Sequence, residues 1–179
     1  LGEGATCHVY KAQDALLGHP VAIKVVRPNL AIHARFRARF DREVALSAQV
    51  VHPRVIPVFD VGRLDDGRPF VTLACADSGS LSDLLDTQPT LTEALRLIDQ
   101  VLEALAAMHA MGLVHQDLKP ANVLLHQRQH REALGPVDAW VADLGVAGAM
   151  AELALHQRGI SGTPTWMAPE QRDGRYAEL

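Results

Sequence analysis

The sequence has little cysteine, no excess of positive charge and no long hydrophobic run. Its two cysteines, Cys7 and Cys75, are too few for a disulfide framework and lack metal-ligand spacing, which favours a reducing compartment. No apolar segment approaches the roughly 18 residues that cross a bilayer, and no basic stretch leads into an apolar one at the start. A formal net charge of -4 provides no basic field for nucleic acid. We therefore expect a cytoplasmic protein, with no nucleic-acid partner and no membrane segment in the visible chain.

The two ends of the sequence predict a longer parent polypeptide. Leu1 is not an initiator methionine, and the residues before Leu179 are polar, with no closing helix. A membrane anchor beyond Leu179 therefore stays open.

The first part of the chain has the pattern of a small antiparallel sheet with one helix. At 179 residues and 48% hydrophobic, the chain can bury the core of one domain or of two small lobes that share a cleft. Residues 30–50 are predicted to form a helix, because apolar residues recur at roughly helical spacing: Phe36, Phe40, Val44, Ala48 and Val50. Short β-type runs lie on either side of it, at residues 9–12, 20–26, 55–61 and 70–74.

The second part has a helical pattern. Thr90, with Glu93 three residues later, predicts the start of a long helix, and Gly112 predicts its end. Ser78, Gly79 and Ser80 mark the join, so we expect an N-terminal lobe of residues 1–76 and a C-terminal lobe of residues 77–179. Within the long helix, apolar residues recur at steps of three or four: Leu91, Leu95, Ile98, Leu102, Leu105 and Met108.

A short loop carries an acid, a base and an amide. Lys119 and Asn122 lie two and five residues after Asp117. A carboxylate can take the proton of an attacking hydroxyl, an ammonium can neutralise a phosphoryl group in transfer, and an amide oxygen can bind magnesium. The loop therefore indicates phosphoryl transfer, although a polar turn between buried strands also collects these residue types.

Three further features are individually ambiguous. Gly2 and Gly4 form a glycine loop that could admit phosphate oxygens, but a tight hairpin turn has the same composition, and Cys7 stands where a third glycine would be expected. Lys24 lies within an apolar strand, either with an acidic partner or at an edge that reaches solvent. Glu43 is a candidate partner, and the alternative is an ordinary surface carboxylate.

Taken in order, these motifs resemble the eukaryotic-type (Hanks-type) serine/threonine protein kinase family, in its bacterial branch. The set runs from the glycine loop through V-A-I-K, the helix glutamate, H-P-R-V-I in place of H-P-N-I-V, and H-Q-D-L-K-P-A-N to D-L-G and A-P-E. The resemblance covers nearly the whole chain. It implies an α+β, two-lobed kinase fold, with a small antiparallel-sheet lobe plus one helix followed by a truncated helical lobe.

The resemblance also implies a role for each matching residue, with ATP and Mg²⁺ as cofactors and a protein Ser/Thr hydroxyl as substrate. Asp117 is the expected catalytic base, with Lys119 on the γ-phosphate, Lys24 on the α- and β-phosphates paired with Glu43, and Thr163 supporting Asp117. Asn122 and Asp143 are the expected magnesium ligands. The expected nucleotide-binding residues are Leu1, Gly2, Gly4, Val9, Ala22, Lys24, Leu73, Ala74, Cys75, Ala76 and Leu124.

One departure from the family concerns regulation. Gln116 stands where most regulated kinases have an arginine that pairs with a phosphorylated activation loop, and an amide cannot replace that charge-assisted bond. Ser161 is the only hydroxyl residue between Asp143 and Gly162. We therefore expect activity that does not require activation-loop phosphorylation; the alternative is that Gln116 is tolerated and Ser161 or Thr163 is still phosphorylated. A pseudokinase or nucleotide-binding scaffold without catalysis remains the alternative function.

Overall fold

The computed structural model describes residues 2–3, 6–127, 137–143, 164–167 and 169. The chain divides into two compact units. In the described part of the chain, the strand unit comprises residues from Leu1–Gln49 and Pro57–Cys75. The helical unit comprises Val50–Ile56, Ala76–Leu144 and Gly162–Leu179, so that the short segment Val50–Ile56 belongs to a different unit from the residues on either side of it.

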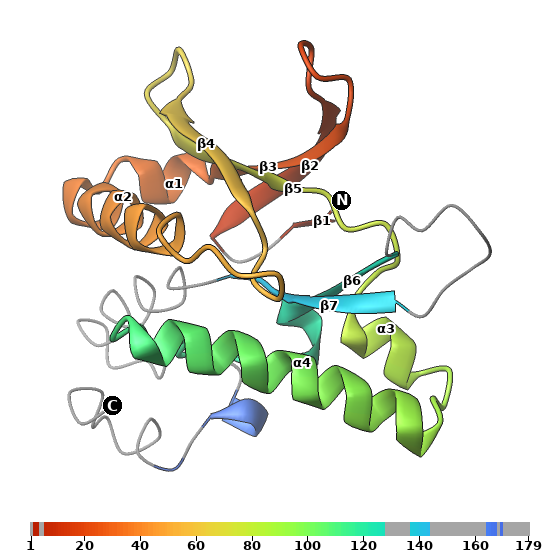
Figure 1. Ribbon diagram of the computed structural model, residues 1–179. Coiled ribbons are helices and arrows are strands. Elements are labelled where there is room, and N and C mark those ends of the chain that lie inside the picture. The colour runs from red at the N-terminus through yellow and green to blue at the C-terminus, as the bar shows by residue number, and fades with distance from the viewer. Residues whose placement is uncertain (1, 4–5, 128–136, 144–163, 168, 170–179) are drawn as a thin grey trace. The chain divides into compact units, whose positions relative to one another are not determined.

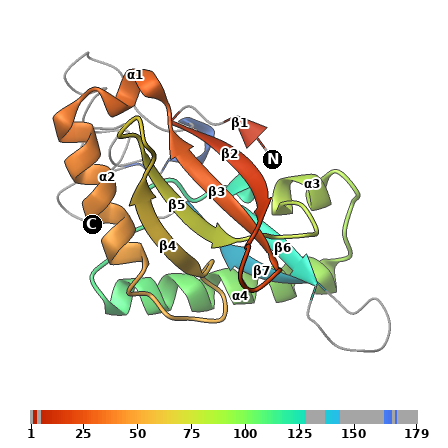
Figure 2. The same ribbon diagram turned by 90° about the horizontal axis from the view of Figure 1, so that it is seen from above.

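The strand unit contains a five-stranded antiparallel sheet with the order β1-β2-β3-β5-β4 (Figures 1 and 2). Its sheet confirms the expected architecture, and β3 has the predicted bounds. Gly18 and Gly67, with φ of 69° and 81°, supply the left-handed backbone that the hairpin turns require. The strands are β1 (Gly2–Glu3), β2 (Cys7–Gln13), β3 (Pro20–Val26), β4 (Val58–Arg63) and β5 (Pro69–Ala74).

The strand predicted at residues 55–61 begins later than expected. β4 starts at Val58, because Val55 and Ile56 pair elsewhere. Val55 forms a parallel bridge with Val141, and the N–H of Ile56 donates to the carbonyl of Val141 at 3.0 Å. Residues 55–61 have a β pattern throughout. The sequence alone therefore did not show which strand Val55 and Ile56 would pair with.

Two helices occupy the region where one was predicted. α1 (Pro28–Ala31) is a single turn, and α2 (Ala34–Ser47) is the longer helix that packs against β5 (Figure 2). Phe36, Phe40 and Val44 are almost completely buried, which confirms the predicted apolar face. α2 ends at Ser47, before residue 50, and Val50 is buried in the other unit.

The described part of the helical unit contains the helices α3 and α4 and a two-stranded antiparallel sheet (Figure 1). Its longest element is α4 (Leu91–Ala110), on which β7 packs. The other elements are α3 (Leu81–Leu85), β6 (Val123–Gln127), β7 (Val137–Val141) and the 3₁₀ turns η1 (Pro120–Asn122) and η2 (Pro164–Trp166). α3 was not predicted, although Ser80 and Asp83 form a reciprocal capping box at its start.

The ends of α4 follow the sequence signals. The Thr90 hydroxyl accepts the N–H of Glu93 at the start. At the end, Gly112 has φ of 70°, its N–H donates to the carbonyl of His109, and the N–H of Leu113 donates to the carbonyl of Met108. This Schellman pattern satisfies the last carbonyls and needs the conformational freedom of glycine. No helix in the described residues is both long and apolar enough to cross a membrane.

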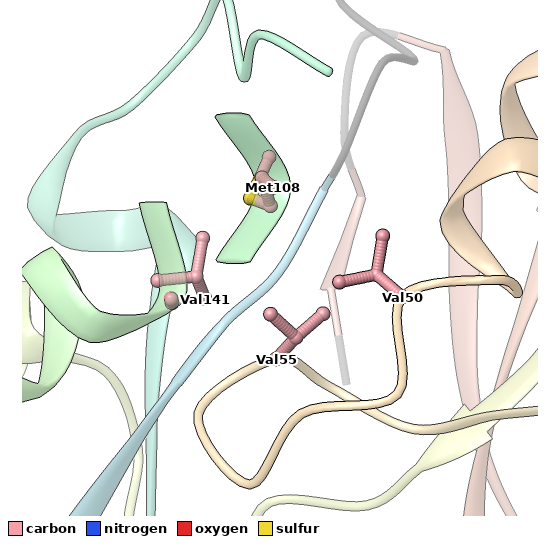
Figure 3. Close-up of a cluster of buried hydrophobic side chains, with 5 residues drawn as sticks. Val50, Val55, Met108 and Val141 are labelled. Carbon is pink, nitrogen blue, oxygen red and sulfur yellow. The ribbon is translucent and has the colours of Figure 1, made fainter. Parts of the chain in front are cut away.

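The buried face of α4 shares Met108 with the stripe seen in the sequence but otherwise differs from it. Leu97, Ala104 and Met108 are no more than 1% exposed, whereas Leu91 and Leu95 are more than half exposed. α4 is apolar on two sides, and spacing alone cannot show which side meets the hairpin. Figure 3 shows one of the resulting clusters, in which Met108 lies near Val50, Val55 and Val141.

We expect Met108→Ala to lower the free energy of unfolding by about 3 kcal/mol, because it empties volume in a packed cluster. Met111→Ala is the matched control: Met111 is 46% exposed, and its loss should cost about 0.5 kcal/mol or less. Urea denaturation of both variants measures the difference. Equal losses would contradict the placement of Met108 in this core.

Candidate active site

Within the strand unit, the register of the sheet brings four of the expected nucleotide-binding residues to one face. Val9 lies opposite Lys24, and Ala22 lies opposite Leu73. Ala22 and Lys24 are two residues apart on β3 and therefore share a face, and directly opposed residues of antiparallel strands do the same. Ala22 and Leu73 are buried, and Val9 and Lys24 are partly buried. The result is an apolar surface with one ammonium group.

The pKa of the Lys24 side chain is perturbed. Burial lowers the pKa of its ammonium group from 10.5 to about 8, and the electrostatic influence of Cys7 opposes the shift. Burial also raises the pKa of the Cys7 thiol, so that Cys7 is a poor nucleophile near neutral pH. A partly desolvated ammonium on an apolar face is suited to an anionic ligand, which would favour its charged form.

Glu43 pairs with Arg39, a partner that was not predicted from the sequence. Its Oε1 accepts from Nε of Arg39 at 2.7 Å, one helical turn earlier on α2. The i, i+4 spacing of Arg39 and Glu43 was the available signal. The pairing of Glu43 with Lys24 stays a prediction, and both residues lie in the strand unit.

Within the helical unit, the structure brings together the three loop residues singled out from the sequence. Nζ of Lys119 lies 2.8 Å from Oδ2 of Asp117. Nδ2 of Asn122 donates to the same carboxylate oxygen at 3.1 Å and to the carbonyl of Asp117 at 2.8 Å. η1 fixes this spacing, because its turn from Pro120 to Asn122 folds the amide back onto Asp117.

His115 anchors this loop, a role that its sequence position did not reveal. Its Nδ1 accepts the N–H of Asp117 at 3.3 Å, so the proton of the neutral ring lies on Nε2, which donates to the carbonyl of Ala142 at 2.9 Å. Burial lowers the pKa of His115, which keeps the ring neutral at pH 7. Gln116, between His115 and Asp117, has φ of 63°, a rare conformation for a residue with a side chain.

The donor set at the end of β7 fits a magnesium ion. Asp143 follows the strand and offers a carboxylate, and the N–H of Ala142 donates to the carbonyl of Asn122 at 2.9 Å. The amide nitrogen of Asn122 is committed to Asp117, so its amide oxygen is the atom suited to a cation. The described residues contain no group of three or more His, Cys, Asp or Glu that could hold a metal ion by itself. Magnesium suits such a sparse set, because it commonly takes one or two protein ligands and completes its shell with phosphate and water.

The remaining predicted residues divide between described and undescribed parts. Ala74 is buried, Cys75 and Ala76 are partly buried, and Leu124 is partly buried on β6 opposite Trp140. Gly2 lies in β1 opposite Val9. Leu1, Gly4, Thr163 and Ser161 lie outside the described residues.

Comparison with known proteins supplies the family. The family model of the protein kinase domain matches residues 1–177. RqkA of Deinococcus radiodurans, a DNA damage-responsive serine/threonine-protein kinase, is 39% identical over 181 residues, which are 97% of this chain and 25% of that protein. PknD of Mycobacterium tuberculosis, a serine/threonine-protein kinase, is 34% identical over 177 residues, again 97% of this chain and 25% of that protein. The chain thus spans about a quarter of the length of these relatives.

A solved structure agrees with the sequence relatives. The kinase domain of Mycobacterium tuberculosis PknI superposes with a TM-score of 0.66 at 30% identity, over 82% of this chain and 57% of that one. The sheet with its helix, the hairpin on α4 and the family model therefore lead to one conclusion: this chain belongs to the protein kinase family and has the kinase fold, with bacterial serine/threonine kinases among its relatives.

Proposed function

We propose that the protein of which this chain is a part transfers the γ-phosphate of ATP to a serine or threonine hydroxyl of a protein. The observation that carries this proposal is the arrangement around Asp117, whose carboxylate lies within 2.8 Å of an ammonium group and 3.1 Å of an amide on one short loop. The names of the relatives, which are serine/threonine kinases, support the substrate class.

Each residue then has a task set by its chemistry. Asp117 accepts the proton of the attacking hydroxyl, and Lys119 moves from its partner Asp117 toward the transferring phosphoryl group as negative charge develops there. Lys24 holds the α- and β-phosphates with its ammonium group. Val9, Ala22 and Leu124 contact adenine through apolar side chains. Leu73 is the gatekeeper residue, and the adenine-binding hinge residues are Ala74, Cys75 and Ala76. Leu1, Gly2 and Gly4 belong to the loop that covers the phosphates, and Thr163 supports Asp117.

Asn122 and Asp143 hold Mg²⁺ in this proposal. When bound, the ion neutralises charge on the β- and γ-phosphates. The task of the protein is to keep an amide oxygen and a carboxylate in a fixed relation, and Ala142 provides the connection. Its N–H bonds the backbone of Asn122, and it is the residue immediately before Asp143.

Gln116 supports a second part of the proposal, that activity does not depend on activation-loop phosphorylation. A neutral amide cannot form the bidentate, charge-assisted bond that an arginine makes with phosphate. The Asp117 carboxylate already has two donors within its own loop, so its position does not require an external phosphate.

Asp117→Asn should reduce phosphate transfer to a protein substrate by about 100-fold or more, because the amide cannot accept the hydroxyl proton. We expect ATP affinity to stay within about twofold of the parent protein, since the amide keeps the size of the carboxylate. Asp99→Asn on the exposed side of α4 is the control and should be neutral. Transfer of labelled phosphate from ATP to casein measures the rate. A parent protein that binds ATP and transfers nothing would instead identify a nucleotide-binding scaffold.

The lowered pKa of Lys24 predicts that ATP binding takes up protons near pH 8. Without nucleotide, the Lys24 ammonium group is half deprotonated at that pH, and the phosphates favour its charged form, so binding should take up about half a proton at pH 8. Lys24→Arg should take up none through this position, because a guanidinium stays charged. Calorimetry in two buffers of different ionisation enthalpy measures the uptake. Equal values for the two proteins would disprove a perturbed Lys24.

Ser161→Ala should leave the rate of the full-length protein within about twofold, because Gln116 supplies no charge to bind a phosphate. Gln116→Arg should likewise give no gain in the Ser161→Ala protein. Steady-state transfer rates, with mass spectrometry of residues 144–163, test both expectations. A rate that falls by most of its value in Ser161→Ala would show that phosphorylation at this serine does control activity.

A further inference from the structure

Val50–Ile56 interacts with β7 through both its backbone and a side chain. The carbonyl of Arg54 accepts the N–H of Val141 at 2.8 Å, and the N–H of Ile56 donates to the carbonyl of Val141 at 3.0 Å. β7 is thus bonded on one side to β6, where Val141 lies opposite Val123, and on the other side to this segment. The side chains of Val55 and Val141 also pack in the same apolar cluster, which is shown in Figure 3.

The side chain of Arg54 makes a second connection to the same strand. Its Nη1 lies 2.9 Å from Oδ2 of Asp138, and its Nε lies 3.2 Å from Oε2 of Glu103 on α4. Arg54 is the residue that stands in H-P-R-V-I where the family pattern H-P-N-I-V has asparagine. Asparagine is uncharged and shorter, so it could not join two carboxylates in this way.

Asp138 is a buried carboxylate with several donors. It is 5% exposed, and besides Arg54 its Oδ1 accepts from Nε2 of Gln100 at 2.9 Å and lies 3.4 Å from Nη1 of Arg96. Gln100 in turn accepts the N–H of Ala139 at 2.7 Å through Oε1. A charge buried to this extent is stable only with such partners, so the network strongly disfavours any other position of β7.

Together these contacts hold β7 at two points. Arg54 bonds Val141 through its backbone and Asp138 through its side chain, and these two positions are three residues apart along the strand, or about 10 Å. A slip of the strand by one residue would break both contacts and turn Asp138 to the opposite face. Since Ala142 bonds Asn122 and precedes Asp143, the register of β7 determines how these two residues lie relative to each other.

We propose that Arg54 and Asp138 are positioning residues that set the relation between Asp143 and Asn122, and thereby the affinity for the divalent cation. The inference rests on the proposed function for the role of those two ligands. It adds that the ion pair between Arg54 and Asp138, neither of which is a metal ligand, controls cation binding by fixing the register of β7.

The test compares the parent protein with Arg54→Met/Asp138→Asn. This double variant leaves no unpaired buried charge, and the asparagine oxygen can still accept from Gln100, so the protein should remain folded by circular dichroism. We expect the dissociation constant of Mn²⁺ in the presence of ADP, measured by electron paramagnetic resonance, to rise at least fivefold. We also expect the amide of Val141 to exchange hydrogen at least tenfold faster. Two controls should stay within twofold of the parent: ADP binding without metal, and exchange of the Leu125 amide, which bonds the carbonyl of Gly79.

Arg63→Met is the matched control protein, because it removes an arginine from an exposed ion pair with Asp41 in the strand unit. It should leave Mn²⁺ binding unchanged. Unchanged Mn²⁺ affinity in the folded double variant would overturn this proposal alone, whereas a parent protein that binds no Mn²⁺ with ADP would overturn the proposed function with it. If the double variant does not fold, Arg54→Lys decides the question. Lysine keeps the charge but cannot bridge Asp138 and Glu103 in the fixed geometry of a guanidinium, so a fivefold weaker affinity supports the proposal and an unchanged one overturns it.

Discussion

The backbone of Ala142 is the point on which the helical unit depends. Its N–H donates to the carbonyl of Asn122, and its carbonyl accepts from Nε2 of His115. These two bonds join the loop that carries Asp117 to the strand that leads into Asp143, and they do so in the buried interior, where an unmade bond is costly. The loop and the end of β7 therefore behave as one rigid piece rather than as two separate turns.

This connection explains how the site holds two unfavourable backbone conformations. Gln116 and Asp143 have φ of 63° and 64°, a region that costs residues with side chains about 1 kcal/mol or more. Gln116 lies between His115 and Asp117, which bond each other directly, and Asp143 follows Ala142. Each strained residue is thus adjacent to bonds that fix the chain on at least one side. Such strain persists only where the surroundings determine the conformation, and it commonly marks functional positions.

Local signals in the sequence predicted local structure well, and contacts between distant segments poorly. β3 followed from a short run of β-type residues, and the two ends of α4 followed from the Thr90 cap and Gly112, because those signals act within a few residues. The face of α4 that is buried could not be chosen, since both sides are apolar. The pairing of Arg54 with Asp138 could not be predicted either, because neither residue has a neighbour in sequence that points to the other. The chemistry of Asp117, Lys119 and Asn122 was readable because one short loop contains all three.

Two carboxylates in the described part of the helical unit, Asp117 and Asp138, are paired by cations of the same unit, and this bears on the proposal about regulation. Asp117 is paired by Lys119 and Asn122, while Asp138 is paired by Arg54 and Arg96, and the buried ring of His115 carries no charge at neutral pH. A site whose carboxylates lacked such partners would need an added group, such as an arginine beside the base with its phosphate, to hold them in place. Here the order comes from the loop and the strand themselves. Gln116 is therefore consistent with the electrostatics around Asp117, where Lys119 already supplies a cation, and this supports the proposed independence from activation-loop phosphorylation.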